Sequence, residues 1–174
     1  MWSEKSVKPK ERQDKTPEQA LTSLMRLCAR AEKSSGDALR LMRTWGVAES
    51  AREGVLQKLL DQRFIDDERY TAAFVREKTN LNGWGLYKIR AALQRKGIAR
   101  HVIEAALSTT DPAASLERLL IQLQRKARTT KQATPYELKT KLIRYGLSLG
   151  YEYEMVVEAA SSITKSTDEN DLCF

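Results

Sequence analysis

The chain has 174 residues, of which 41% are hydrophobic and 30% are charged, and its 30 lysines and arginines outnumber its 23 aspartates and glutamates. No apolar run approaches the roughly 18 to 20 residues that a membrane span needs, and the first residues include no apolar stretch that could serve as a secretory signal. We therefore expect a soluble, basic, cytoplasmic protein with no membrane partner.

The composition favours helices over strands, because 21 leucines and 19 alanines stand against only seven valines and seven isoleucines. Two cysteines, Cys28 and Cys173, and the single histidine His101 are too few for a disulfide framework or a metal site of cysteines and histidines. The sequence also lacks a phosphate-binding glycine loop. An all-α protein with no catalytic residues, no metal and no cofactor is expected.

Three prolines mark predicted helix starts, because each follows a residue that caps helices well. The first and third of these starts also have glutamine or glutamate three residues after the cap, which completes a capping box. The three pairs are Thr16-Pro17, Asp111-Pro112 and Thr134-Pro135.

Apolar residues at helical spacing place the helices between these starts. In chain order, one helix runs from Thr16 to Ser34, a second is closed by Gly46, a third ends before Phe64, a fourth begins at Asp66 or Asp67 and breaks at Asn82-Gly83, a fifth is closed by Gly97, a sixth carries Val102 and Leu107, a seventh follows Pro112, and an eighth begins at Thr134 and is closed by Gly146.

The pattern of apolar residues and closing glycines recurs along the chain. The same spacing leads to Gly46, Gly97 and Gly146, and Val102-Ile103-Glu104-Ala105-Ala106 is echoed by a similar run that begins at Val156. We predict three tandem three-helix repeats stacked into an elongated, curved body. The competing interpretation is one compact helical bundle. The predicted segments are a basic tail 1–15, repeats 16–65, 66–110 and 111–163, and an acidic flexible tail 164–174.

The middle of the chain resembles the RecX family of recombinase regulators. The resemblance rests on the paired aspartates before Arg69-Tyr70, on the run Phe74-Val75-Arg76-Glu77, and on Lys88-Ile89-Arg90-x-x-Leu93-x-x-Lys96-Gly97-Ile98. It is weaker at 28–34 and, in the third repeat, consists of the helix pattern alone. It covers about residues 16 to 163.

The resemblance implies three tandem three-helix repeats without enzymatic activity. It implies binding within the helical groove of the RecA–DNA filament, where members of the family curb ATP hydrolysis and strand exchange by RecA. It assigns mainly structural roles to the motif residues Asp66, Asp67, Arg69, Tyr70, Phe74, Ile89, Leu93 and Gly97.

Charge is uneven along the chain. Residues 84–150 contain 13 lysines and arginines against four acidic residues, whereas residues 151–174 contain one against six. This asymmetry predicts a polyanionic partner. The candidate contacts are Lys88, Arg90, Arg95, Lys96, Arg100, Arg118, Arg125, Lys126, Arg128, Lys131, Lys139, Lys141, Arg144 and, as an aromatic that could stack on bases, Trp84.

Plainer interpretations stand beside these. Each lysine or arginine could belong to a solvated helix face, and Asp66-Asp67-Glu68 is better explained as a helix start than as a metal site. For function, the expected partner is the RecA filament, with single- or double-stranded DNA as a further contact, and the chain is expected to be a monomer. The alternative is a small basic helical module that binds DNA or RNA directly.

Overall fold

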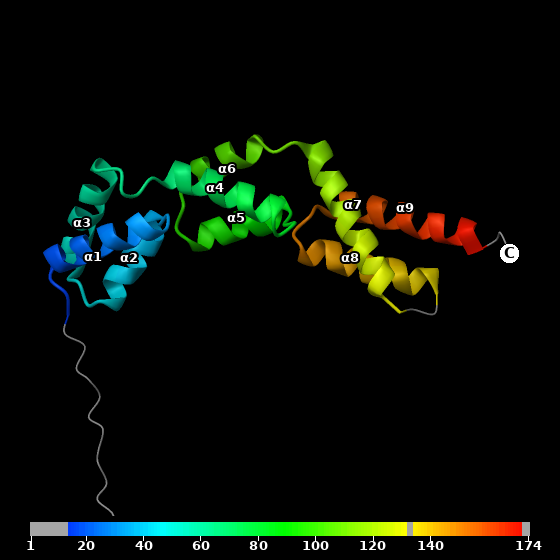
Figure 1. The fold of residues 1–174 in the computed structure, drawn as a ribbon, viewed down its shortest axis with the longest axis horizontal. Coiled ribbons are helices and arrows are strands. Elements are labelled where there is room, and N and C mark those ends of the chain that lie inside the picture. The colour runs from blue at the N-terminus through cyan, green and yellow to red at the C-terminus, as the bar shows by residue number, and fades with distance from the viewer. Residues whose placement is uncertain (1–13, 132–133, 172–174) are drawn as a thin grey trace, which may run out of the picture. The chain divides into compact units, whose positions relative to one another are not determined.

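The structure, a computed structural model, describes residues 14–131 and 134–171, with side chains described as far as Lys165. This part of the chain forms nine helices and no strands, so the predicted all-α class is confirmed (Figure 1). The chain divides into two compact units, residues 1–66 and residues 67–174. No helix in the described part is long and apolar enough to cross a membrane.

The first unit is a set of three helices, α1 (Pro17–Arg30), α2 (Ser35–Thr44) and α3 (Glu49–Asp61). The capping box predicted at the start of α1 is present, because the Thr16 hydroxyl accepts from the backbone N–H of Gln19 and the Gln19 side chain accepts from the N–H of Thr16. Local sequence thus defines where this helix begins.

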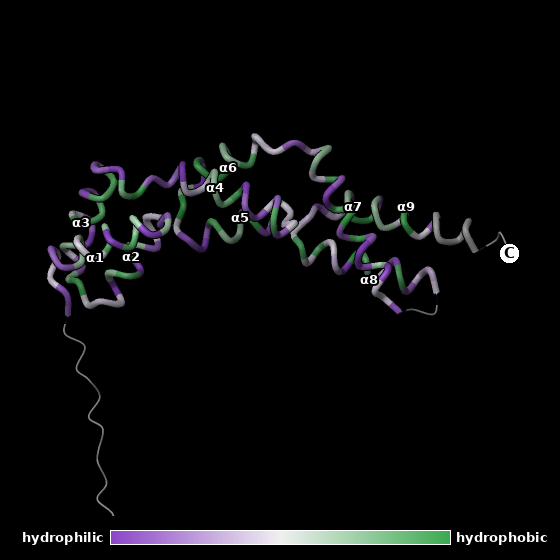
Figure 2. Tube along the Cα trace, in the orientation of Figure 1, coloured by the Kyte–Doolittle hydropathy of each residue, from purple (hydrophilic) through white to green (hydrophobic). Residues whose placement is uncertain are grey.

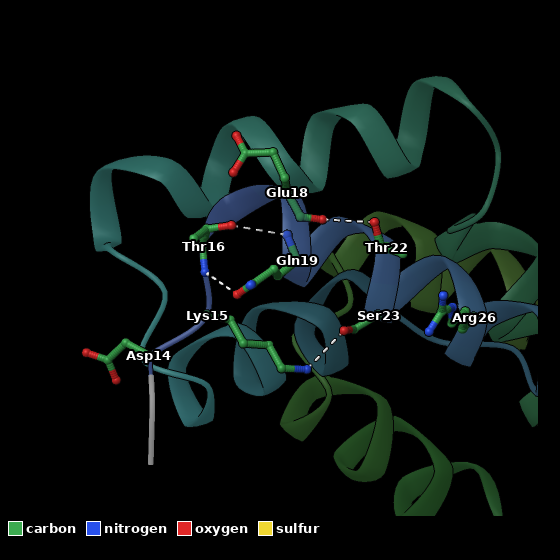
Figure 3. Close-up of a pocket in the computed structure, with 8 residues that line it drawn as sticks. All are labelled: Asp14, Lys15, Thr16, Glu18, Gln19, Thr22, Ser23 and Arg26. Atoms are coloured by element: carbon green, nitrogen blue, oxygen red, sulfur yellow. Dashed lines mark hydrogen bonds between the residues drawn. The ribbon is translucent and has the colours of Figure 1, made fainter. Parts of the chain in front are cut away.

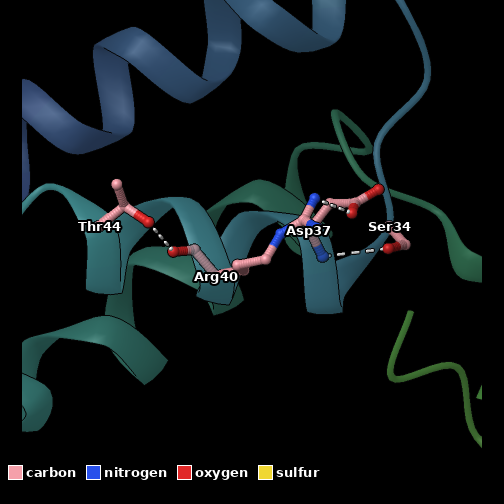
Figure 4. Close-up of polar contacts among 4 residues, drawn as sticks. All are labelled: Ser34, Asp37, Arg40 and Thr44. Atoms are coloured by element: carbon pink, nitrogen blue, oxygen red, sulfur yellow. Dashed lines mark hydrogen bonds and ion pairs between the residues drawn. The ribbon is translucent and has the colours of Figure 1, made fainter. Parts of the chain in front are cut away.

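The start of α2 is fixed in the same way by a buried serine. The Ser34 hydroxyl accepts from the backbone N–H of Asp37 at 3.1 Å, and Arg40 forms a 2.8 Å ion pair with Asp37 one turn further on (Figure 4). Ser34 is the last residue of the segment 28–34, which resembles the family weakly. In the structure this serine is the N-cap of α2.

The core of the first unit takes one apolar stripe from each helix. Leu24 from α1, Met42 from α2 and Leu59 from α3 are fully buried together with Ile65, which follows α3. Along each helix, hydrophobic positions alternate with hydrophilic ones at helical spacing (Figure 2). Each fully buried leucine or methionine contributes about 1.5–3 kcal/mol to folding.

The second unit contains two further sets of three helices. The first is α4 (Asp67–Asn80), α5 (Leu86–Arg95) and α6 (Arg100–Ser108), around a core that includes Ile89, Leu93 and Ile103. The second is α7 (Pro112–Thr129), α8 (Pro135–Ser148) and α9 (Tyr153–Asp171), around Leu119 and Leu142. Each set has its own core, as expected for stacked helical repeats.

The two helical sets of the second unit are joined end to end through backbone atoms. The N–H of Gly85, just before α5, donates to the carbonyl of Leu149, just after α8, and the N–H of Tyr87 donates to the carbonyl of Gly150. The ammonium group of Lys88 also donates to the carbonyl of Ser148 at 3.0 Å. The C-terminal end of α8 therefore caps the N-terminal end of α5.

The prediction that Gly146 closes the eighth helix is wrong. Gly146 lies inside α8, which continues to Ser148, and the glycine with positive φ after this helix is Gly150, at +84°. A Cβ at residue 146 would lie 2.7 Å from a methyl group of Val156. Gly146 is therefore small so that α9 can pack closely, and the closing glycine lies one helical turn later than in the sequence pattern.

The last helix also extends further than predicted. Thr164, which begins the predicted acidic tail, is buried within α9, and this helix continues to Asp171. The basic tail predicted for 1–15 lies outside the described residues except for Asp14 and Lys15.

Candidate interaction surface

Most of the candidate basic residues are exposed on the second unit. They come from the C-terminal end of α5, the start of α6, the C-terminal half of α7 and the body of α8. No carboxylate pairs with them in the part of the chain that the structure describes. The exposed residues are Arg95, Arg100, Arg125, Lys126, Arg128, Lys131, Lys141 and Arg144, and Lys139 is half-buried.

A second group of candidates is occupied by contacts within the fold. Lys88 binds the carbonyl of Ser148 and lies over the Trp84 ring, and Lys96 lies over the Tyr70 ring. Among the exposed cations, Lys126 lies over Tyr145, and Lys141 donates to the backbone carbonyl of Lys131. These side chains stabilise the unit, and the sequence could not separate them from the uncontacted ones.

Arg90 is held by a bidentate ion pair across the second repeat. Its Nε and Nη2 atoms donate to the two carboxylate oxygens of Glu104 at 2.8 and 2.9 Å, which ties α5 to α6. The hydrogen bonds from Arg90 lower the pKa of Glu104, and the bonds to Glu104 raise the pKa of Arg90. Arg90 therefore has a structural role within the second repeat, and its contact with a partner stays a prediction.

Trp84 is packed, although its position between two glycines suggested a free aromatic. Its ring meets the ring of Phe74 edge to face, at 6.5 Å between centroids, and the ammonium groups of Lys78 and Lys88 lie 5.5 and 4.8 Å from it. Exposed aromatic rings are found instead at Tyr87 and Tyr136, which are 57% and 80% exposed.

The family-motif residues lie at structural positions. Asp66 directly precedes α4 and Asp67 lies in its first turn. Acidic side chains stabilise a helix at this end, because the helix dipole is positive there. Exposed Arg69 lies in this same first turn. Buried Tyr70 stacks on Phe74, Ile89 and Leu93 are fully buried, and Gly97 has a φ of +75° after α5. Within the described residues, no group of three or more acidic, cysteine or histidine side chains could hold a metal ion.

One hollow in the first unit is explained by helix-start chemistry. It surrounds the beginning of α1, and its polar groups bind one another (Figure 3). Lys15 donates to the Ser23 hydroxyl, the Thr22 hydroxyl donates to the Glu18 carbonyl, and Thr16 is bonded to Gln19. Most of the uncharged polar groups of this hollow are therefore occupied by contacts within the fold.

A cleft in the second unit brings together two arginines from different helical sets. It has a volume of about 430 Å³ and lies between α4 and the connection from α6 to α7, with Arg76 from α4 and Arg118 from α7 among its lining residues. The charge count singled out Arg118 but missed Arg76, which lies outside the basic segment. The sequence feature that relates Arg76 to the cleft is its spacing, because Ala72, Arg76 and Asn80 are four residues apart and therefore share one face of α4.

Comparison with known proteins identifies similar domains in the second unit. The model of the RecX second three-helix domain matches residues 66–107, and that of the RecX third three-helix domain matches residues 114–159. The Regulatory protein RecX of Clostridium botulinum is 33% identical over 129 residues, which are 73% of this chain and 58% of that protein. The protein of the same name from Halalkalibacterium halodurans is 29% identical over 119 residues, which are 68% and 45%. This chain therefore spans about half the length of these relatives.

Two solved structures share the fold. The crystal structure of RecX from Lactobacillus salivarius superposes with a TM-score of 0.74 at 18% identity, over 84% of this chain and 95% of that one. A crystal structure of regulatory protein RecX gives a TM-score of 0.78 at 23% identity, over 84% and 73%. Because models of two successive RecX domains match this chain and a regulatory protein RecX is 33% identical over 73% of it, this chain belongs to the RecX family.

Proposed function

We propose that this protein binds the RecA–DNA filament along its groove and restrains ATP hydrolysis and strand exchange by RecA. It would thereby modulate DNA repair and recombination, including the SOS response, as a monomer in the cytoplasm. Membership of a family whose relatives are named regulatory protein RecX supports a regulatory role.

The observation that carries the proposal is the set of uncontacted cations on the matched domains. Arg95 and Arg100 from the second repeat and Arg125 and Arg128 from the third are exposed, and none of them forms an ion pair with a carboxylate within the described part of the chain, although the charge of Arg100 acts on Glu104. A filament of protein and DNA presents a polyanionic surface to which such cations are drawn. The proposed mechanism is steric occupation with charge complementarity, without a chemical step.

Direct binding of nucleic acid is the second candidate function. It is favoured by the exposed rings of Tyr87 and Tyr136, which lie among basic residues on α5 and α8. Aromatic rings between cations suit single strands, because bases stack on the rings while phosphates bind the cations. Such a module would bind bare DNA or RNA without RecA, and its affinity would fall steeply with salt.

One titration separates the two candidates. DNA-dependent ATP hydrolysis by RecA is measured as this protein is added below and up to equimolar ratio, and binding to the same DNA without RecA is measured at the same salt. Inhibition without tight binding to bare DNA supports the filament regulator. Undiminished hydrolysis together with tight binding to bare DNA contradicts it and favours the direct binder.

A further inference from the structure

The cleft between α4 and the α6–α7 connection has the shape and charge of an anion site. Its lining is more apolar than polar, and it includes three alanines from three different helices, Ala72 from α4, Ala106 from α6 and Ala114 from α7. Because alanine side chains end at Cβ, these three positions leave the space of about 430 Å³ open. A packed core would fill such a space with larger side chains.

Two guanidinium groups line this space, and the structure provides neither with an acidic partner. Arg76 is exposed and its side chain makes no polar contact within the described residues. Arg118 is half-buried, and its Nη2 donates to the Ser115 hydroxyl at 3.2 Å. Burial raises the pKa of nearby Tyr151 and the charge of Arg118 partly lowers it again, but the Tyr151 hydroxyl has no hydrogen-bond partner within the described residues. The Ser115 hydroxyl that accepts from Arg118 is neutral, so the positive charge of Arg118 is not compensated.

One carboxylate lies in the same lining. Asp111 is the N-cap of α7, and its Oδ1 accepts from the backbone N–H of Ala113 at 2.9 Å. Two positive groups against one negative group leave the cleft with a positive balance. At the amino end of α7, the N–H of Ala113 is bonded to Asp111 Oδ1 and the N–H of Ser115 to the Asp111 carbonyl, so this helix end adds little positive charge to the cleft.

We propose that this cleft binds a phosphate of a nucleic-acid backbone, held between Arg76 and Arg118. Arginine forks match the oxygens of a phosphate bidentately, and the volume admits the adjoining sugar as well as the phosphate group. The ligand would contact the second and third repeats at once, since Arg76 and Arg118 belong to different helical sets. The inference deepens the proposed function and rests on it, because the filament supplies the nucleic acid. One phosphate site alone should bind bare DNA only weakly and at low salt, which is compatible with a filament regulator that does not bind bare DNA tightly.

The test uses the full chain and a fluorescein-labelled oligo(dT) of about 30 nucleotides, titrated at several salt concentrations from about 20 mM upward. The variant Arg76→Gln/Arg118→Gln should bind at least about tenfold more weakly at low salt, with a shallower dependence of affinity on salt. The matched control Arg26→Gln/Arg30→Gln removes the same charge from exposed positions on α1 and should lose at most about threefold.

A second variant separates a shaped site from a general charge effect. Ala114→Leu fills the cleft and keeps both arginines, so it should weaken oligo(dT) binding as the double variant does. Ala72→Leu, at an exposed position on α4, makes the same test if Ala114→Leu lowers the helix content seen by circular dichroism. Wild-type affinity in a folded cleft-filling variant would overturn the proposal.

The remaining outcomes also decide the matter. An equal loss in the α1 control, or no binding of the wild type to oligo(dT) at about 20 mM salt, overturns the phosphate site. If Arg76→Gln/Arg118→Gln binds oligo(dT) normally but inhibits RecA poorly, the cleft binds an acidic group of a protein, and the phosphate proposal is wrong. Inhibition of RecA by the wild type is measured separately, so the proposed function can stand when the cleft proposal fails.

Discussion

The backbone N–H of Gly85 donates a 2.8 Å hydrogen bond to the carbonyl oxygen of Leu149, which joins the start of α5 to the end of α8. Helix starts have unpaired N–H groups and helix ends have unpaired carbonyls, so each end satisfies the other. The opposed partial charges of the two helix ends add attraction. The two helix ends lie so close together that a Cβ at residue 85 would be 2.2 Å from the carbonyl oxygen of Gly150.

We expect Gly85→Ala to lower the free energy of unfolding by about 1–3 kcal/mol, because the methyl group meets a backbone carbonyl that cannot move without breaking the junction. Urea denaturation followed by circular dichroism measures the loss. Gly54→Ala is the control, since a Cβ at this position in α3 meets nothing within 4 Å. That change should stabilise by about 0.5–1 kcal/mol. A stabilising effect of Gly85→Ala would contradict the tight junction.

The close packing of Gly146 against Val156 gives a second prediction. Gly146→Ala should destabilise by about 1–3 kcal/mol, although alanine favours helices, because the added methyl group would lie 2.7 Å from Val156. Val156→Ala removes the clashing methyl groups. The double variant should therefore lose less than the sum of the two single losses, with a coupling of about 0.5–3 kcal/mol in urea denaturation. Strict additivity would show that the two residues do not press on each other.

The helix starts were predictable from sequence because they depend on neighbouring residues. Thr16 with Gln19 needs no distant partner to define a cap. Gly146 was misassigned because its small size serves a contact with Val156 in another helix, and the sequence pattern shows spacing but not contacts. The ion pair of Arg90 was not predicted for the same reason, since its partner Glu104 lies in the next helix.

The sequence predicted which segment of the chain is basic, but not which of its side chains are exposed. Counting charges found the basic segment, but it could not show that Lys88 is bonded within the fold whereas Arg95 is exposed. Arg76 was missed because it comes from outside that segment and reaches the cleft of Arg118 through the packing of α4 against α6, which leads into α7. Sites formed by separate helices require the tertiary structure.

The ion pair between Arg90 and Glu104 predicts a dependence of stability on pH. The folded state lowers the pKa of Glu104, first through the hydrogen bonds from Arg90. The stabilisation is therefore fully present above the ordinary glutamate pKa of 4.5 and is lost as the pH falls through the lower pKa of the folded state. Between pH 7 and acid pH, wild type should lose more stability than Glu104→Gln, as measured by thermal unfolding across that range. Parallel pH profiles would show that the pair contributes nothing.

The uncontacted arginines provide the most direct test of the proposed regulatory surface. Arg95, Arg100, Arg125 and Arg128 form no ion pair at contact distance in the described part of the chain, so changing all four to glutamine should leave the helix content unchanged. About tenfold more protein should then be needed for half-inhibition of ATP hydrolysis by RecA at low salt, because the charges that attract the filament are gone.

The matched control for this variant changes the same four arginines to lysine. Charge is retained while the planar guanidinium group is lost, so long-range attraction persists and bidentate contacts do not. Near wild-type inhibition by the lysine variant would show that these positions act through charge. Equal losses in both variants would show that they bind phosphates or carboxylates through their forks. If the glutamine variant inhibits RecA as well as the wild type, this basic surface plays no part in filament binding, and the cleft of Arg76 and Arg118 would have to account for recognition.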